Sequence, residues 1–168
     1  MIEMTPTEEQ IKEAHFNASH LLNLQGSITK GAGSIAGALG EIVVRDFFNY
    51  VQASSKNYDM YTSEGKTIDV KTKRCSSAPR GYYECSINSQ SLHQQCDEYI
   101  FVRVLKNLKT LWIVGRIDKD KYFEKATRYK AGDKDESNNF IFKSTSYNLA
   151  IEDLCPIQQH DCSASPSS

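Results

Sequence analysis

Two segments near the start of the chain place apolar residues at helical spacing. In the first, Thr5-Pro6-Thr7-Glu8 resembles a helix start with a threonine cap, and the apolar positions that follow predict a helix ending near 25–26. In the second, small and apolar residues form one stripe over 34–51, after a glycine-containing connector. That stripe consists of Ala36, Leu39, Val43, Phe47 and Tyr50.

The segment 57–74, NYDMYTSEGKTIDVKTKR, has the pattern of a β-hairpin. Two runs rich in β-branched and aromatic residues flank a short polar turn with one glycine, Gly65. If the loop has three residues, Met60 faces Ile68, and Asp59 lies opposite Asp69. A two-residue loop would instead place the two aspartates on opposite faces, because a one-residue slip turns every side chain over. The match of apolar residues favours the three-residue loop.

Within that register, the alternation of side chains gives the hairpin two different faces. Tyr58, Met60, Ile68 and Val70 form an apolar face that suits a core, whereas Asp59, Asp69 and Lys71 share the other face.

The rest of the chain predicts further strands around a charged segment. We expect a strand with mixed sidedness at 82–87, a short polar helix at 89–97, and two nearly continuous apolar strands at 99–105 and 110–117, the first of them central in a sheet. Residues 118–139 are heavily charged, with a short helix that Phe123 and Ala126 could dock. An edge-like strand at 140–142 and a closing segment at 147–154 follow. We expect one domain over 1–156, divided into 1–32, a core at 33–117 and an extension at 118–156, and a disordered tail at 157–168.

Two carboxylates that face each other across a ladder repel and destabilise the sheet. A sequence that keeps such a pair usually has a positively charged group between them. A hard divalent cation is the simplest candidate for Asp59 and Asp69, and Lys71 could then steady a water or a phosphate oxygen. The alternative is an exposed charged face on which Lys71 pairs with Asp69. Glu41 is either a half-exposed helix residue or a third carboxylate aimed at the same face.

Basic residues gather around the hairpin, although the formal net charge of the 168-residue chain is only −1. Such a cluster suits the backbone of a polyanion, or it is a solvated rim. The cluster consists of Lys66, Lys71, Lys73, Arg74 and Arg80.

Composition narrows the class of protein. The hydrophobic fraction is 39%, no apolar run is long enough to span a membrane, and the acidic start lacks the features of a signal peptide. Five cysteines without C-x-x-C spacing argue against a disulfide framework or a zinc site. We therefore expect a cytoplasmic protein with reduced thiols and no membrane partner.

The order of these motifs resembles the core of the PD-(D/E)XK nuclease superfamily, the restriction-endonuclease-like fold. The matching motifs are GALGE with Glu41, NYDMY with Asp59, and IDVKTKR with Asp69 and Lys71, over about residues 33–105. The chain departs from the family by carrying Tyr58-Asp59 where the family name has Pro-Asp, and aspartate rather than the commoner glutamate at Asp69. Residues 95–99 also fit the Q-x-x-x-Y motif of the exonuclease branch, which we interpret as coincidence because a helix runs into a strand there.

The resemblance implies an α/β fold with a central mixed sheet flanked by helices, in the order αβββαβ. It also implies that Asp59 and Asp69 hold Mg²⁺, for which Mn²⁺ could substitute, that Glu41 assists, and that Lys71 orients the attacking water. The implied activity is hydrolysis of DNA phosphodiesters, as an endonuclease, with a phage-type nuclease or a Holliday-junction (branched-DNA) resolvase as narrower options. DNA would contact Lys66, Lys73, Arg74 and Arg80. A homodimer, a non-catalytic nucleic-acid-binding or assembly protein that keeps the fold, and an unrelated α/β protein remain open.

Overall fold

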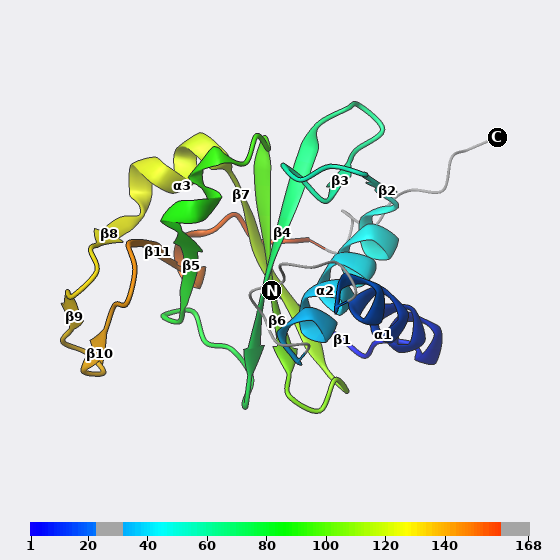
Figure 1. Ribbon diagram of the computed structural model, residues 1–168, viewed down its shortest axis with the longest axis horizontal. Coiled ribbons are helices and arrows are strands. Elements are labelled where there is room, and N and C mark those ends of the chain that lie inside the picture. The colour runs from blue at the N-terminus through cyan, green and yellow to red at the C-terminus, as the bar shows by residue number, and fades with distance from the viewer. Residues whose placement is uncertain (23–31, 159–168) are drawn as a thin grey trace.

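A mixed six-stranded sheet runs through the centre of the molecule (Figure 1). The computed structural model describes residues 1–22 and 32–158. Strand β4 (Thr67–Cys75) is parallel to β6 (Glu98–Leu105), whereas the other neighbours in the sheet are antiparallel. The order is β1-β7-β6-β4-β3-β2, in which the remaining strands are β1 (Ile2–Met4), β2 (Val51–Gln52), β3 (Met60–Tyr61) and β7 (Leu111–Asp118).

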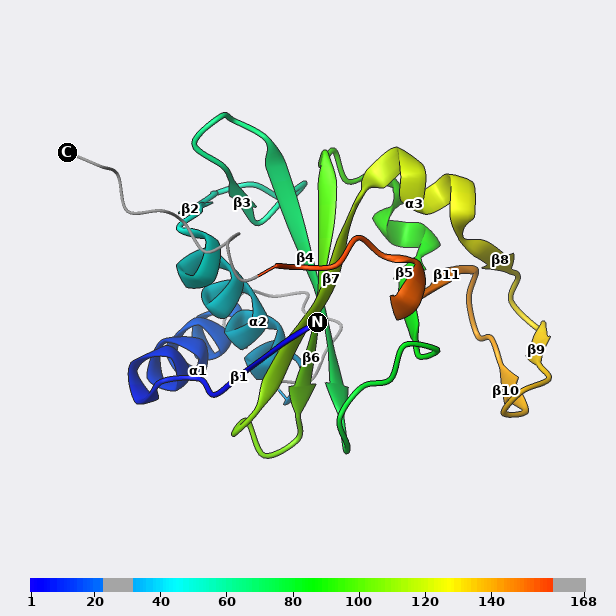
Figure 2. The same cartoon turned by 180° about the vertical axis from the view of Figure 1, so that it is seen from behind.

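Different layers cover the two faces of this sheet. Helices α1 (Glu8–Leu22) and α2 (Ala32–Phe48) lie on one side, as both views show (Figures 1 and 2). On the other side lie α3 (Lys119–Lys125) and a three-stranded antiparallel sheet in the order β5-β11-β8. Its strands are β5 (Glu84–Asn88), β11 (Ser146–Ala150) and β8 (Thr127–Tyr129). The predicted class, α/β with a mixed sheet and flanking helices, is confirmed at this level.

Two apolar clusters correspond to the two faces. The cluster under α2 contains Ile68 and Val70 of β4, and the cluster under the small sheet contains Tyr99 and Phe101 of β6. Residues 68 and 70 therefore point toward α2. Residues 69 and 71 point the other way, because side chains alternate along a strand. Membership of the apolar cluster under α2 thus confirms the sidedness that the sequence predicts for Ile68 and Val70 of β4.

Local chemistry explains where the two long helices begin and end. Thr7 and Gln10 cap α1 reciprocally: the Gln10 N–H donates to Thr7 Oγ1 at 3.1 Å, and the Thr7 N–H donates to Gln10 Oε1 at 3.0 Å. Helix α2 ends at Phe48, and the next residue, Asn49, has a left-handed φ of 55°. Arg45 of α2 pairs with Glu13 of α1 at 2.6 Å, which ties the two helices together.

The crossover between the parallel strands β4 and β6 builds part of the second layer. It contains β5 and the short 3₁₀ helix η1 (Ser89–His93), which Asn88 caps by accepting from the Gln90 N–H at 3.0 Å. The strand predicted at 82–87 therefore exists, but it pairs with β11 rather than with the central sheet. The expected αβββαβ core has its third strand in the central sheet. Strand β5 instead lies outside the six-stranded sheet, so the structure differs from that core here.

The C-terminal part closes the second layer. Among the described strands, the hairpin strands β9 (Lys134–Asp135) and β10 (Phe140–Ile141) pair only with each other, and η2 (Ile151–Asp153) follows β11. Phe123 and Ala126 pack against the second cluster, as predicted. Ile157 is buried in the first cluster although the sequence assigns it to the tail, and residues 159–168 lie outside the described residues.

The strand β1 is not predicted by the sequence, which has only three residues there to indicate it. It pairs with β7 at the sheet edge, and Trp112 Nε1 donates to Glu3 Oε2 at 2.9 Å. Within the described residues, none of the helices is both long and apolar enough to cross a lipid bilayer.

Candidate metal-binding active site

The β3–β4 turn has the predicted three-residue loop. The Thr62 N–H donates to the Lys66 carbonyl at 2.9 Å, and Gly65 has φ of 82°, which glycine adopts without strain. Met60 pairs with Ile68, the register expected from the apolar match. Residues 69 and 71 accordingly lie on the face away from α2.

The ladder stops at Met60, so Asp59 does not pair with Asp69 as predicted. The Asp59 N–H donates to the Ile68 carbonyl at 2.9 Å although Met60 already pairs with Ile68, which places two residues against one as in a β-bulge. The interruption of the alternation explains why Tyr58 packs against the second cluster rather than beside Met60. The predicted apolar face was wrong at this residue.

The bulge gives Asp59 a different route to the site. Its Oδ2 accepts the Val70 N–H at 2.7 Å, a backbone group of β4 that the short strand β3 leaves without a ladder partner. The carboxylate is thereby held against β4, one residue from Asp69. Since Oδ2 takes this bond, Oδ1 is left for another ligand.

Asp69 and Lys71 form a buried ion pair rather than an exposed one. Asp69 is only 2% exposed, and Lys71 Nζ lies 2.7 Å from its Oδ2. Gln94 joins the two: it donates to Asp69 Oδ1 at 3.2 Å and accepts from Lys71 Nζ at 2.8 Å. The Lys71–Asp69 pair of the alternative interpretation is therefore present, but the exposure that it expects is wrong for Asp69.

Glu41 of α2 reaches the same region. Burial, followed by the charges of Asp59 and Asp69, raises the pKa of the Glu41 carboxyl to about 8. Burial, followed by the charge of Asp69, raises the pKa of Asp59 to about 6. Burial also raises the pKa of Asp69, while Lys71 opposes that shift. Three carboxyls and one ammonium thus share a partly dehydrated space, and a cation would relieve their repulsion.

The donor set suits a hard cation that keeps part of its water shell. Within residues 1–22 and 32–158, no three His, Cys, Asp or Glu side chains lie close enough together to hold a metal ion. Mg²⁺ does not need three, since one or two carboxylates with waters are a common protein site. Asp69 Oδ2 is buried and its close cationic partner is Lys71 Nζ, so it could bind a cation beside Asp59 if the lysine moved aside.

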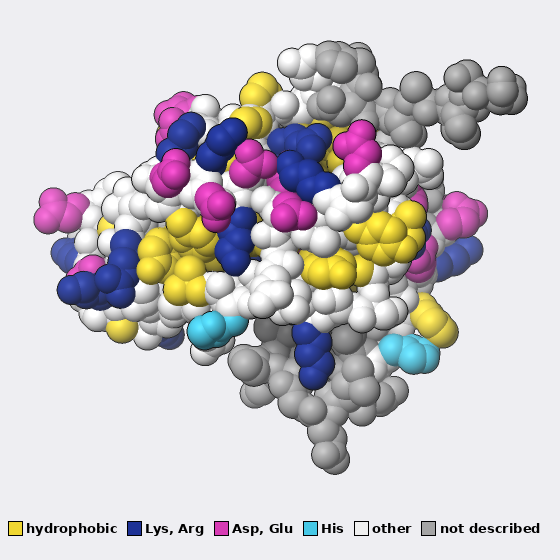
Figure 3. Space-filling view, turned by 90° about the horizontal axis from the view of Figure 1, so that it is seen from above, with side chains coloured by type: hydrophobic (Ala, Val, Ile, Leu, Met, Phe, Trp, Pro, Cys, Tyr) yellow, Lys and Arg dark blue, Asp and Glu magenta, His cyan; other side chains and the backbone are white. Residues whose placement is uncertain are grey.

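The predicted basic cluster does not form one surface. Lys66 pairs with Glu98 at 2.5 Å and with Asp118 at 3.0 Å. Arg74 Nη2 lies 3.5 Å from the Lys106 carbonyl, and Arg80 Nη1 lies 3.4 Å from the Tyr82 hydroxyl. Around the β3–β4 end of the molecule, side chains of both signs are interspersed (Figure 3). Only Lys73 continues the face of β4 that carries Asp69 and Lys71.

Gln94 and Lys119 are site residues that the sequence analysis missed. Gln94 precedes the residue singled out by the Q-x-x-x-Y match, and it is Gln94 that touches the site, whereas Gln95 is exposed. Lys119 donates to the Gln94 carbonyl and so holds η1 against the start of α3. The 3₁₀ turn decides which glutamine points inward, and no helical or strand periodicity encodes that choice.

Comparison of the chain with models of known protein families found no match, and comparison with curated proteins found none at a significant level.

Proposed function

We propose that the protein is a Mg²⁺-dependent deoxyribonuclease that hydrolyses DNA phosphodiester bonds, acting as an endonuclease. The observation that carries this proposal is the gathering of Glu41, Asp59, Asp69 and Lys71 at the point where β4 separates from β3. The four residues come from three segments of the chain, and the raised pKa values reflect negative charge held out of water. Such perturbed groups cluster at functional sites.

Each residue has a role that its position supports. Asp59 and Asp69 would hold the metal ion, and Glu41 would orient a water. The ion, when bound, would polarise the phosphate and activate that water. Lys71 would orient the attacking water or offset the negative charge that develops on the phosphate. In the reaction, the water oxygen forms one P–O bond while the bond to the leaving deoxyribose oxygen breaks.

The proposed partner is DNA and the proposed location is the cytoplasm. The four described cysteines, Cys75, Cys85, Cys96 and Cys155, are all free, which is consistent with a reducing compartment.

The test is cleavage of supercoiled, linear, single-stranded and branched DNA with Mg²⁺, Mn²⁺ or chelator. Asp69→Asn keeps the shape of the side chain and removes the charge that a hard cation needs. We expect it to lose at least about 100-fold in rate, since both the nucleophile and charge stabilisation depend on the ion. Asp120→Asn, an exposed change on α3, is the matched control and should cut like the parent protein.

Three outcomes separate the alternatives. Cleavage confined to four-way junctions would assign a resolvase. DNA binding without cleavage under any metal would assign the non-catalytic binding module. An Asp69→Asn variant as fast as the parent would remove the metal site from the mechanism.

A further inference from the structure

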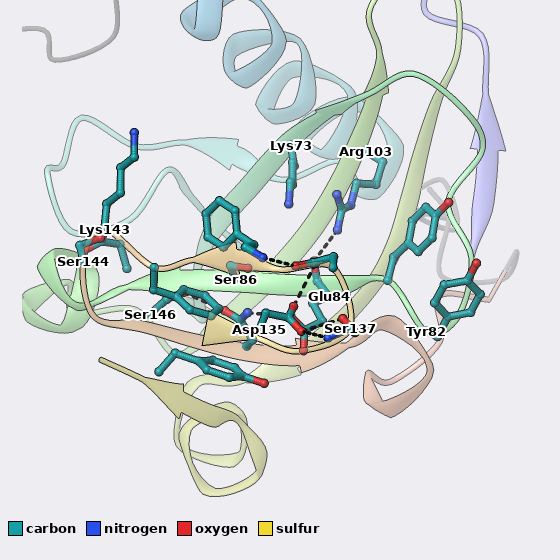
Figure 4. Close-up of a pocket in the computed structure, with 17 residues that line it drawn as sticks. Lys73, Tyr82, Glu84, Ser86, Arg103, Asp135, Ser137, Lys143, Ser144 and Ser146 are labelled. Atoms are coloured by element: carbon teal, nitrogen blue, oxygen red, sulfur yellow. Dashed lines mark hydrogen bonds between the residues drawn. The ribbon is translucent and has the colours of Figure 1, made fainter. Parts of the chain in front are cut away.

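A large pocket includes Lys73 of β4 and Arg103 of β6, further along β4 from Asp69 and Lys71 (Figure 4). Its volume is about 1110 Å³, somewhat above the range of about 300–1,000 Å³ that holds a drug-sized ligand. The central sheet supplies Lys73 and Arg103, and the small sheet and the β9–β10 hairpin supply most of the other walls. Neither Asp59, Asp69 nor Glu41 lines it, so it is separate from the carboxylate site.

Two cations stand side by side in this pocket. Lys73 and Arg103 are direct neighbours across the parallel β4–β6 ladder, and both side chains project toward β5 (Figure 4). Arg103 is only 5% exposed, and its Nη2 donates to the Glu84 carbonyl at 2.5 Å. Among the described residues, Lys73 makes no ion pair. Like charges directly opposite each other destabilise a sheet, so an anion placed between them would be stabilising.

Among the described residues, neither carboxylate of the pocket forms an ion pair with Lys73 or Arg103. Glu84 Oε2 accepts from Asn148 Nδ2 at 2.7 Å. Asp135 accepts from Ser137 and Asn138 within its own turn. Burial, followed by the charge of Arg103, lowers the pKa of Lys73, while the charges of Cys85 and Glu84 oppose that shift.

Aromatic rings surround the cations. Tyr82 is 62% exposed and Phe140 is 53% exposed, and both line the pocket. Tyr129 and Phe142 are stacked, with ring centroids 4.3 Å apart. Basic side chains that track a phosphate backbone, combined with rings on which bases stack, are the usual means of binding single-stranded nucleic acid.

The pocket is aligned with the proposed active site. Lys71 and Lys73 lie on one face of β4, about 7 Å apart along the strand, or about two nucleotides at the 3.4 Å rise of a stacked strand. We propose that the pocket binds an unpaired nucleotide adjoining the scissile phosphate, so that the substrate is single-stranded DNA or an unpaired stretch within a duplex. This inference rests on the proposed nuclease function for its scissile phosphate.

The experiment measures binding in chelator, where no cleavage can occur. Fluorescence anisotropy compares a labelled oligodeoxynucleotide of about 12 residues, within the usual range of single-strand site sizes, with the duplex of the same sequence. The variants are Lys73→Gln and Tyr82→Ala. Because the Tyr82 side chain is exposed, Tyr82→Ala should fold like the parent, so that a loss of binding reports the pocket. Lys12→Gln and Phe16→Ala are the matched charge and ring controls on α1, across the central sheet.

We expect the single strand to bind at least about tenfold more tightly than the duplex. Each pocket variant should weaken single-strand binding about tenfold, the usual loss when one stacking or phosphate contact is removed, while the two controls change it by less than about twofold. Equal affinity for single strand and duplex would overturn the inference, as would pocket variants that bind like the parent.

A parallel cleavage assay with Mg²⁺ separates this failure from failure of the proposed function. Tight single-strand binding through Lys73 and Tyr82 without any cleavage would support the proposed role of the pocket and contradict the proposed nuclease function. The opposite result is cleavage that Asp69→Asn abolishes, with pocket variants that bind and cut both DNA forms like the parent. That result would support the proposed nuclease function and contradict the proposed role of the pocket.

Discussion

At the scale of single residues, the Asp69–Lys71 pair shows how one charge depends on another. The Asp69 side chain is 3% exposed and that of Lys71 is 23% exposed, so the aspartate depends on the lysine more than the reverse. Removing one partner of a buried pair leaves the other uncompensated, at a cost of about 3–5 kcal/mol for full burial. Lys71→Met should therefore lower the free energy of unfolding, by less than that because Lys71 is partly solvated.

The parent protein, Asp69→Asn, Lys71→Met and the double variant together form a double-mutant cycle. Asp69→Asn with Lys71→Met should recover most of the lost stability, because neither charge then remains buried. Urea unfolding of the four proteins in chelator measures the coupling. If the double variant is as unstable as Lys71→Met, the cost lies in packing rather than in charge.

The Glu41 carboxyl predicts how stability changes with pH. Its pKa is raised from 4.5 to about 8 in the folded protein, so the folded state holds the proton more tightly than the unfolded state does. Stability is therefore greatest below about pH 4.5 and is lost as pH rises toward 8. Glu41→Gln should remove this loss and stabilise the metal-free protein at pH 8.5 by on the order of 2 kcal/mol.

The measurement is urea unfolding in chelator at pH 5 and pH 8.5, with Glu9→Gln on the exposed surface of α1 as the control. Addition of Mg²⁺ should narrow the difference between the parent and Glu41→Gln, since the cation offsets the same repulsion. An identical pH dependence for the parent and the variant would show that Glu41 is not held in a negative environment.

The sequence predicted part of this site because alternation along a strand is a local property. Asp69 and Lys71 lie on the expected face because β4 is regular through both positions. Asp59 does not face Asp69 directly, because a bulge at a strand end depends on the partner strand and on the carboxylate that bonds the Val70 N–H. Gln94 was missed for a similar reason: its contacts arise from the docking of η1 on β4.

At the scale of elements, the contact between α2 and β4 brings Glu41 to the site. Gly40 lies against Thr72, and a Cβ at residue 40 would meet Thr72 Oγ1 at 2.1 Å and Cγ2 at 3.1 Å. Rotation of the threonine cannot remove both contacts. Gly40→Ala should lose about 1–3 kcal/mol of stability by overpacking, which exceeds the gain of about 1 kcal/mol from the better helix former.

Gly37 is the matched control one turn earlier in α2, where a Cβ would meet nothing within 4 Å. Gly37→Ala should raise stability by up to about 1 kcal/mol. Thermal unfolding compares the two variants, and Gly40→Ala should also slow DNA cleavage because it shifts the neighbouring Glu41. Equal stabilisation by both changes would mean that α2 can move away from β4 at no cost.

Most elements could be predicted because their periodicity is strong. Strands β6 and β7 have nearly continuous apolar runs, interrupted within by Arg103 and Arg116, and both lie in the central sheet. The sheet in which β5 sits could not be predicted, because its pairing with β11 joins residues about 60 positions apart, and nothing local in either strand specifies that partner. The small strands β1 and β9 are too short for any pattern.

At the scale of the whole molecule, charge is nearly balanced and of mixed sign. With a net charge of −1, the protein should bind DNA through few phosphates and with a shallow dependence on salt. Lys143→Gln, at the exposed rim of the pocket, should reduce the slope of log affinity against log salt by about 1. Lys12→Gln, on α1, should leave it unchanged.

The contrasting variant is Lys125→Gln at the end of α3, a second candidate path for the DNA. Anisotropy titrations at several salt concentrations give each slope. A reduced slope for Lys125→Gln and an unchanged slope for Lys143→Gln would indicate that the DNA contacts α3 rather than the pocket.

The β9–β10 hairpin has a consequence for how this scaffold could change. Within the described part of the chain its two strands pair only with each other, yet Asp135 and Phe140 form part of the pocket wall. Residues 134–141 can therefore be lengthened, shortened or exchanged without breaking a hydrogen bond of the central sheet or moving a carboxylate. Transplanted hairpins would produce a series of proteins with the same carboxylate site and different pocket walls, and the hairpin is the natural position for a library.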